Sequence, residues 1–221
     1  MKILICGMPR TGSTVLWSIV NIILNIKYSK HQKDFAWNFK STLPKENYVL
    51  KIHEYFENHD NKCIIGKNLA EWADIIISTN RNFEDIVKSI IIKKKKNNKN
   101  ILKYYDEKEC VEKKYNFNKL EELNLWCSYI TKNAYEKWKK YSNYEFIYER
   151  YINNRDEVIL ELKKILNCED IKTEDIILKL NNIKEKQTNN KNHFSINYNF
   201  SLGNDIKEMI KKDYNKFKIN L

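Results

Sequence analysis

The chain has 221 residues, 42% of them hydrophobic, and a formal net charge of +11. This length can bury a substantial core, and we expect residues 1–221 to form one domain. The basic balance favours anionic partners, although the abundance of Asn, Lys and Ile is typical of A/T-rich coding and reduces the weight of this signal.

The cysteines and the hydropathy pattern indicate the cellular compartment in which we expect the protein. Five cysteines are scattered without a Cys-x-x-Cys pair, so we expect neither a disulfide framework nor a metal site, and a reducing, cytoplasmic location. An apolar strand begins within two residues of the N-terminus, so we expect no leader peptide. The apolar run 19–26 is interrupted by Asn21 and Asn25, so we expect no membrane span.

In chain order, short apolar segments alternate with segments of helical periodicity. Such alternation predicts βαβ crossovers, and hence a three-layer α/β fold with a mostly parallel central sheet flanked by helices. Segments 31–46 and 97–117 are expected as loops flanking a cleft. The expected strands are 2–8, 47–53, 73–79 and 144–148, and the expected helices are 13–27, 82–95, 118–140, 155–167, 173–185 and 204–217.

The first strand leads into a loop with two of the four glycines of the chain. Glycine lets backbone N–H groups turn toward an anion, and the helix that follows adds its partial positive charge. A P-loop would have Lys directly after the second Gly, but Ser13 stands there and the basic residue is Arg10. The groups expected to enclose a tetrahedral anion are the Arg10 guanidinium, the hydroxyls of Thr11, Ser13 and Thr14, and the backbone amides from Thr11 through Gly12 to Thr14. The alternative is a tight turn with a surface arginine.

Two further strand ends carry polar side chains on the same predicted edge. Arg81 ends the third strand, and Ser89 follows eight residues later on the next helix, which makes a second phosphate clamp. Lys51 and His53 alternate onto one face of the second strand, where His53 can act as a general base. A lone Arg or His in such positions is more often solvated or structural. The run 93–96 of four lysines is interpreted as the solvated end of a helix.

Taken together, these motifs resemble the sulfotransferase superfamily that uses 3′-phosphoadenosine 5′-phosphosulfate (PAPS). The segment from Pro9 to Thr14 is similar to the family's 5′-phosphosulfate loop, and Leu50–His53 is similar to the Lys-Thr-His segment with the catalytic base. Arg81 and Ser89 match the Arg and Ser that hold the 3′-phosphate. The resemblance covers residues 1 to about 166.

The resemblance is weaker toward the C-terminus. Phe146–Glu149 is similar to the family's Tyr-Glu-Asp segment, which implies that Tyr148 lies near the adenine, although Arg150 replaces the Asp. The family's Arg-Lys-Gly motif is missing as such, and Lys191 is its substitute as a 3′-phosphate ligand.

The resemblance implies transfer of a sulfuryl group from PAPS to a hydroxyl or amine acceptor, without a metal. His53 is then the general base, and Arg10 and Lys51 stabilise the charge on the leaving phosphate. The acceptor is expected to be a small molecule or a saccharide, with no nucleic acid and no membrane span, and the oligomeric state stays undetermined.

Two other classes stay open. One is a P-loop nucleotide kinase or hydrolase, against which the missing Lys after Gly12 argues. The other is a non-catalytic basic protein that binds nucleotides or nucleic acid, with residues 93–96 as contacts, although no nucleic-acid motif is present. A sulfotransferase fold that only binds its ligand is a variant of the second class.

Overall fold

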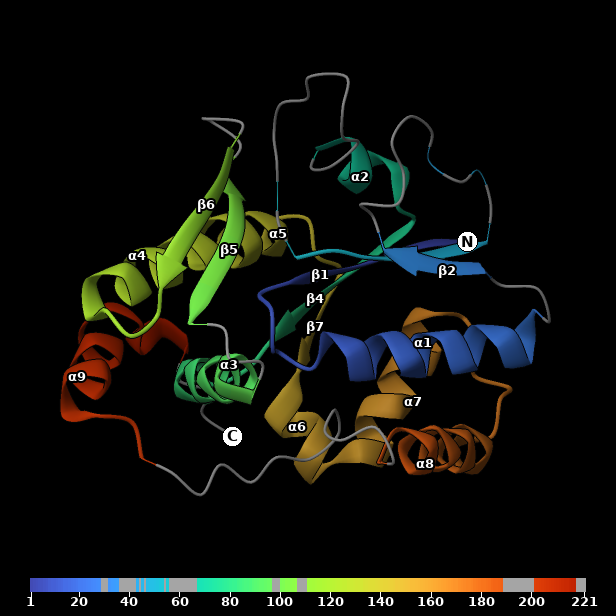
Figure 1. The fold of residues 1–221 in the computed structure, drawn as a ribbon. Coiled ribbons are helices and arrows are strands. Elements are labelled where there is room, and N and C mark those ends of the chain that lie inside the picture. Colours follow the sequence, from blue (N-terminus) through green and yellow to red (C-terminus); the bar gives the residue numbers. More distant parts are fainter. Residues whose placement is uncertain are drawn as a thin grey trace.

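The computed structural model describes most of the chain and shows an α/β fold (Figure 1). Lys191 lies outside the described residues, so its expected role stays a prediction. No helix in the described part is long and apolar enough to cross a membrane. The described residues are 1–28, 32–35, 43, 45, 47–53, 55, 67–96, 100–106, 111–188 and 201–217.

The central sheet has five parallel strands in the order β2-β3-β1-β4-β7, so the predicted parallel sheet is confirmed. Strand β1 lies in the middle, and Ile3 pairs with Val49 on one side and Ile75 on the other. The strands are β1 (Lys2–Gly7), β2 (Gln32–Phe35), β3 (Tyr48–Lys51), β4 (Ile75–Asn80) and β7 (Tyr144–Ile147).

Both faces of this sheet are buried, which explains why the strands are continuous apolar runs. Ile3 and Ile5 of β1 point into one cluster with α1, α7 and α8, and Leu4 and Cys6 point into another on the opposite face, with Trp138. Figure 1 shows α1, α7 and α8 together below the sheet. The helices below the sheet are α1 (Ser13–Lys27), α6 (Tyr148–Asn153), α7 (Arg155–Ile165) and α8 (Thr173–Thr188). Helix α2 (Lys67–Trp72) lies on the opposite face, where its Leu69 joins the cluster of Leu4 and Cys6.

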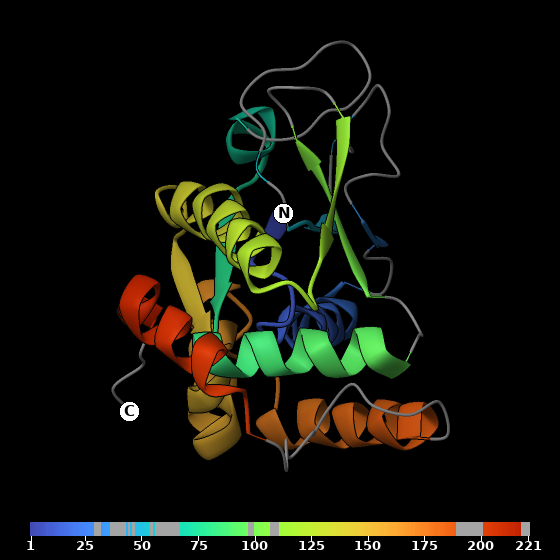
Figure 2. The same cartoon turned by 60° about the vertical axis from the view of Figure 1, so that its left-hand side comes forward.

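A further cluster joins α3 to a hairpin and to the C-terminal helices. Figure 2 shows the hairpin rising above α3, with α4 and α9 beside it. Phe83, Leu102 and Trp126 are buried together there. The elements are α3 (Phe83–Lys96), β5 (Ile101–Asp106), β6 (Val111–Asn116), α4 (Leu120–Ile130), η2 (Thr131–Glu136), α5 (Lys137–Lys139), α9 (Asn204–Asp213) and η3 (Asn215–Phe217).

Four local expectations are wrong. The expected loop 97–117 contains the antiparallel hairpin β5–β6, whose Leu102 packs into the core. The expected loop 31–46 contains strand β2 at the edge of the sheet. The expected helix 118–140 is not continuous, because a π-helical stretch separates α4 from α5. Strand β7 ends at Ile147, and Tyr148 begins a helix instead of ending a strand.

Candidate functional site

The loop between β1 and α1 has a backbone that needs its two glycines. Gly7, Arg10 and Gly12 have φ angles of 123°, 72° and 82°, all in the left-handed region. A Cβ on Gly7 would lie 2.7 Å from the carbonyl oxygen of Thr79, and one on Gly12 would overlap the ring of Tyr148. The left-handed turn at Arg10 is a strained conformation for a non-glycine residue, which the surrounding contacts hold in place.

Thr11 connects the loop to the neighbouring strand β4. It is fully buried, and its Oγ1 donates to the carbonyl oxygen of Met8 at 2.6 Å and shares a hydrogen bond with the hydroxyl of Thr79 on β4. With Thr11 donating to Met8, the hydrogen of the shared bond comes from Thr79, whose hydroxyl oxygen also lies 3.1 Å from the carbonyl oxygen of Cys6. The Thr11 hydroxyl is therefore committed to the loop's own structure, and its backbone N–H is the group that it can offer to an anion.

Helix α1 begins at Ser13, directly after Gly12, and no side chain among the described residues caps it. The first N–H groups of a helix have no partner within the helix, and they carry partial positive charge. Ser13 is buried, and the Thr14 hydroxyl accepts a hydrogen bond of 2.7 Å from Lys51 Nζ. The N-terminus of α1 therefore lies directly beside a buried ammonium group.

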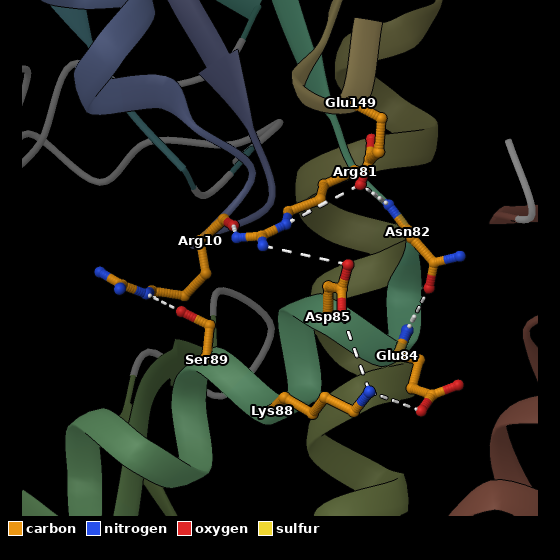
Figure 3. Close-up of polar contacts among 8 residues, drawn as sticks. All are labelled: Arg10, Arg81, Asn82, Glu84, Asp85, Lys88, Ser89 and Glu149. Atoms are coloured by element: carbon orange, nitrogen blue, oxygen red, sulfur yellow. Dashed lines mark hydrogen bonds and ion pairs between the residues drawn. The ribbon is translucent and has the colours of Figure 1, made fainter. Parts of the chain in front are cut away.

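The two arginine motifs predicted from the sequence meet in the structure (Figure 3). Arg10 Nε donates to Ser89 Oγ at 2.7 Å, although the two residues are 79 positions apart in the sequence. Arg81 donates through a terminal nitrogen to the backbone oxygen of Arg10 at 3.4 Å. Hydrogen bonds thus join the loop to helix α3 and to the end of β4, as their positions at the carboxyl ends of β1 and β4 predict.

Arg81 is already surrounded by partners, as Figure 3 also shows. Its guanidinium lies 4.0 Å from Asp85 and 3.9 Å from Glu149, and its side chain is 12% exposed. Glu149 also accepts the backbone N–H of Asn82, and burial raises the pKa of Glu149. Tyr148 lies below the guanidinium, whose carbon is 4.5 Å from the ring centroid. Tyr148 therefore supports Arg81 and covers Gly12, two contacts that the sequence motif did not indicate.

Arg150, the residue that departs from the family's motif, has a structural partner. Its guanidinium donates to Glu161 of α7 at 2.9 Å and also pairs with Glu157. These contacts fasten α6, which carries Tyr148 and Glu149, to α7 of the same layer. Arg150 therefore helps to fix the helix that carries Tyr148 and Glu149.

Lys51 and His53 lie on the side of the loop that faces β3. The backbone N–H of Ile52 donates to Ile5, which extends the β1–β3 pairing and brings His53 Nδ1 to 2.8 Å from the carbonyl oxygen of Gly7. A carbonyl only accepts, so Nδ1 carries the hydrogen and Nε2 carries the lone pair.

Burial and neighbouring positive charges lower the pKa of both Lys51 and His53. Burial, and then repulsion from Arg10 and Lys93, lowers the pKa of Lys51 to about 8. Burial, and then repulsion from Lys51, lowers the pKa of His53 to about 3, against the opposing effect of the Gly7 hydrogen bond. His53 is therefore a neutral base at physiological pH, in a site that favours incoming negative charge.

Lys93 belongs to this cluster, and the sequence interpretation missed it. Lys93 is exposed, as the lysine run predicts, and its ammonium group is also close enough to the cluster that partial loss of water and then the charge of Arg10 lower its pKa. The available signal was its spacing, because Lys93 lies four residues after Ser89 on α3 and thus on the same helix face.

Two other features of the described part lie apart from the loop. An open hollow of about 650 Å³ between the α6–α7 junction and α8 is lined by Tyr151, Arg155 and Asn181, among others, and shares no residue with the loop. Within the described residues, no group of three or more His, Cys, Asp and Glu side chains is placed to hold a metal ion.

In comparisons with known proteins, no family model and no curated protein matches this chain. The functional argument below rests on the residues and their geometry.

Proposed function

We propose that this chain is a PAPS-dependent sulfotransferase with a P-loop NTPase-like fold. The observation that carries the proposal is the hydrogen bond from Arg10 to Ser89, because it brings the loop motif and the Arg81–Ser89 motif into direct contact. Two phosphate-binding motifs that meet in this way suit a ligand with phosphate or sulfate groups at both ends. The parallel sheet, with β1 at its centre and the loop at its carboxyl edge, supports the same assignment.

The site offers suitable residues for both the 5′-phosphosulfate and the 3′-phosphate of PAPS. The left-handed backbone at Gly12 and the uncapped N-terminus of α1 can receive the 5′-phosphosulfate, with Arg10 and Lys51 beside it. Arg81 and Ser89 are the candidate ligands of the 3′-phosphate. Tyr148 holds Arg81 in place for that contact, and Lys191 stays a predicted ligand.

The chemistry follows from the orientation of His53. The acceptor oxygen forms a bond to sulfur while the bond between sulfur and the phosphate oxygen breaks, and the acceptor proton passes to His53 Nε2. Negative charge grows on the leaving phosphate, where Arg10, Lys51 and the α1 N-terminus stabilise it. The products are the sulfated acceptor and adenosine 3′,5′-bisphosphate.

Donor binding also makes His53 a better base. In the free protein, the charge of Lys51 is the second cause of its low pKa, after burial. An anionic donor beside Lys51 offsets this repulsion and raises the pKa of His53. Proton abstraction is therefore linked to occupancy of the donor site, and a hydroxyl acceptor is not activated in its absence.

Calorimetry with adenosine 3′,5′-bisphosphate tests the proposal. We expect saturable binding that is at least ~10-fold weaker for adenosine 5′-monophosphate, which lacks the 3′-phosphate. Arg10→Gln should weaken it by ~10-fold or more, whereas Arg155→Gln, on the exposed surface of α7, should not. A folded sample that binds no bisphosphate at millimolar concentration would overturn the proposal, and Mg²⁺-dependent ATP hydrolysis would favour the kinase or hydrolase class instead.

A variant of the base tests the mechanism. His53→Ala should keep bisphosphate affinity and lose ~10²-fold to 10⁴-fold of the rate of labelled sulfate transfer. Retained turnover would show that His53 is not the base.

A further inference from the structure

Strand β4 ends with a buried amide side chain directly before Arg81. This residue is Asn80, which is 6% exposed. Burying an amide costs free energy unless its donors and its acceptor find partners. Asn80 Oδ1 accepts the backbone N–H of Arg81 at 2.8 Å, and Asn80 Nδ2 donates to the hydroxyl of Tyr135 at 3.3 Å. Asn80 therefore connects the backbone of Arg81 to a residue that lies 55 positions further along the chain.

The Tyr135 hydroxyl determines the orientation of this amide. It donates its single hydrogen to Glu145 at 3.0 Å and accepts a hydrogen bond of 2.8 Å from Lys139 Nζ. The lone pair that is left can only accept, so the amide must turn its NH₂ group to Tyr135 and its oxygen to Arg81. Burial raises the pKa of Tyr135, so the phenol keeps the hydrogen that it donates. The hydrogen bonds therefore run in one direction, from the backbone of Arg81 to the carboxylate of Glu145.

Tyr135 lies in the π-helical stretch η2. A π-helix has wider turns than an α-helix, and short stretches of it are frequent at functional sites. The ring of Tyr135 packs edge-on against Phe217, with 4.9 Å between the ring centroids. Phe217 in turn stacks on Phe83, the first residue of α3. Tyr135 thus supports the turn that carries Arg81 on both sides, through Asn80 before it and through the aromatic rings after it.

We infer that Tyr135 is a positioning residue that acts through Asn80 to orient Arg81 toward the 3′-phosphate of the donor. The inference rests on the proposed function. Tyr148 and two nearby carboxylates hold the side chain of Arg81, whereas Asn80 holds its backbone N–H. Because the guanidinium lies at the end of a long side chain, a small rotation of the backbone misplaces its donors relative to a bound phosphate. Loss of the Tyr135 hydroxyl therefore weakens the contact with the 3′-phosphate and leaves the 5′ end of the donor unchanged.

Two nucleotides that differ only in the 3′-phosphate test this inference in calorimetry. Tyr135→Phe removes the hydroxyl and keeps the ring beside Phe217, and it should weaken binding of adenosine 3′,5′-bisphosphate by ~3-fold to 10-fold. Affinity for adenosine 5′-monophosphate should change by less than ~2-fold, whereas a general loss of structure weakens both nucleotides. In an Arg81→Gln background, Tyr135→Phe should have no further effect on the bisphosphate. Tyr144→Phe is the matched control, since the Tyr144 hydroxyl donates to Glu161 of α7.

The transfer assay gives a second readout. Tyr135→Phe should raise KM for PAPS by ~3-fold to 10-fold and change kcat by less than ~2-fold, because His53 and the β1 loop keep their contacts. Asn80→Ala removes the same connection from its other end and should give the same split between KM and kcat. The double variant should lose no more than either single variant, as expected of residues that act in series. A fall in kcat with KM unchanged would overturn the inference.

Amide hydrogen exchange tests the network without any ligand. The Arg81 amide should exchange at least ~10-fold faster in Tyr135→Phe, and the Ile76 amide, which donates to the Asn143 side chain, is the control. Unchanged exchange at Arg81 would overturn the inference and leave the proposed function standing. Equal changes in affinity for the two nucleotides would do the same. A folded wild type that binds no bisphosphate would overturn the proposed function and the inference together.

Discussion

The two arginine regions of the site differ in how their charge is balanced. At the end of β1, Arg10 lies on a serine hydroxyl and shares its surroundings with Lys51 and Lys93. At the end of β4, Arg81 lies between Asp85 and Glu149 and over the ring of Tyr148. In the first region burial and neighbouring positive charges lower the pKa of Lys51 and of His53, whereas in the second an anion competes with the carboxylates of Asp85 and Glu149. The proposed function therefore assigns charge stabilisation to the β1 region and positioning to the β4 region.

The largest expected effect separates function from stability in the β1 region. Lys51→Met should reduce the transfer rate by ~10²-fold to 10³-fold, because the leaving phosphate loses a cation. The same variant should raise the free energy of unfolding by about 2 kcal/mol, because the fold disfavours the buried charge. Denaturant unfolding and initial rates measure the two effects. Lys163→Met is the matched control, since Lys163 is equally buried at 6% exposure but lies on α7. A variant that is both less stable and fully active would contradict this interpretation of the β1 region.

The next effect tests the contact between the two regions. Gly12→Ala should lower the free energy of unfolding by about 3 kcal/mol, because its φ is 82° and its Cβ would overlap Tyr148. Tyr148→Ala should recover the steric part of this loss in the double variant, as a double-mutant cycle measures. Gly203→Ala is the control, since Gly203 has a φ of −56° and its Cβ would meet only the flexible Asp205 side chain. If the two substitutions lower the free energy of unfolding additively, the contact between Gly12 and Tyr148 contributes nothing to stability.

A pH series tests the neutral state of His53. Its folded pKa of about 3 lies below the ordinary value near 6.5, so the unfolded chain binds the additional proton. The free energy of unfolding should therefore fall as pH falls from 6.5 toward 3, by about 2 kcal/mol between pH 7 and 5 for this group alone. His53→Gln, which can still donate to Gly7, should lack this part of the slope in urea unfolding. A His53 ring signal that titrates near pH 6.5 would contradict the assignment.

The smallest effect probes the carboxylates of the β4 region. Asp85→Asn should increase affinity for adenosine 3′,5′-bisphosphate by ~3-fold to 10-fold in calorimetry, because it removes a competitor for Arg81. Glu84→Gln is the control, since Glu84 pairs with Lys88. Weaker binding in Asp85→Asn would mean that the carboxylate positions Arg81 more than it competes with the ligand.

The sequence was informative wherever a local pattern determines the structure. The apolar run of β1 and the glycine at the start of α1 specify a buried strand and a helix whose bounds, Ser13–Lys27, match the expectation. The hairpin was missed because β6 is mostly polar, with few apolar residues besides Tyr115. The π-helical stretch was missed because the spacing of four residues from Ile130 to Ala134 to Trp138 fits a turn of either an α-helix or the wider π-helix.

For the site, spacing predicted that the Arg10 loop and Ser89 share one edge. It did not predict the residues that contact Arg81 and Thr11 and change what these two side chains can bind. Glu149 reaches Arg81 from a distant helix, and Thr79 holds Thr11 from the adjacent strand. Such contacts between distant segments have no local pattern, and Lys93 was masked by the other lysines of its run.

The position of β1 in the sheet has a consequence for how the protein folds. β1 is made first, yet Ile3 pairs with Ile75, and the loop is held by Thr79. A growing chain that ends before β4 therefore has an apolar first strand with one missing neighbour and no formed loop. Pairings between segments so distant in sequence form slowly, and unpaired apolar strands are prone to aggregation. Strand β1 thus obtains its second neighbour, and the loop after it obtains its anchor, only once the distant strand β4 is present.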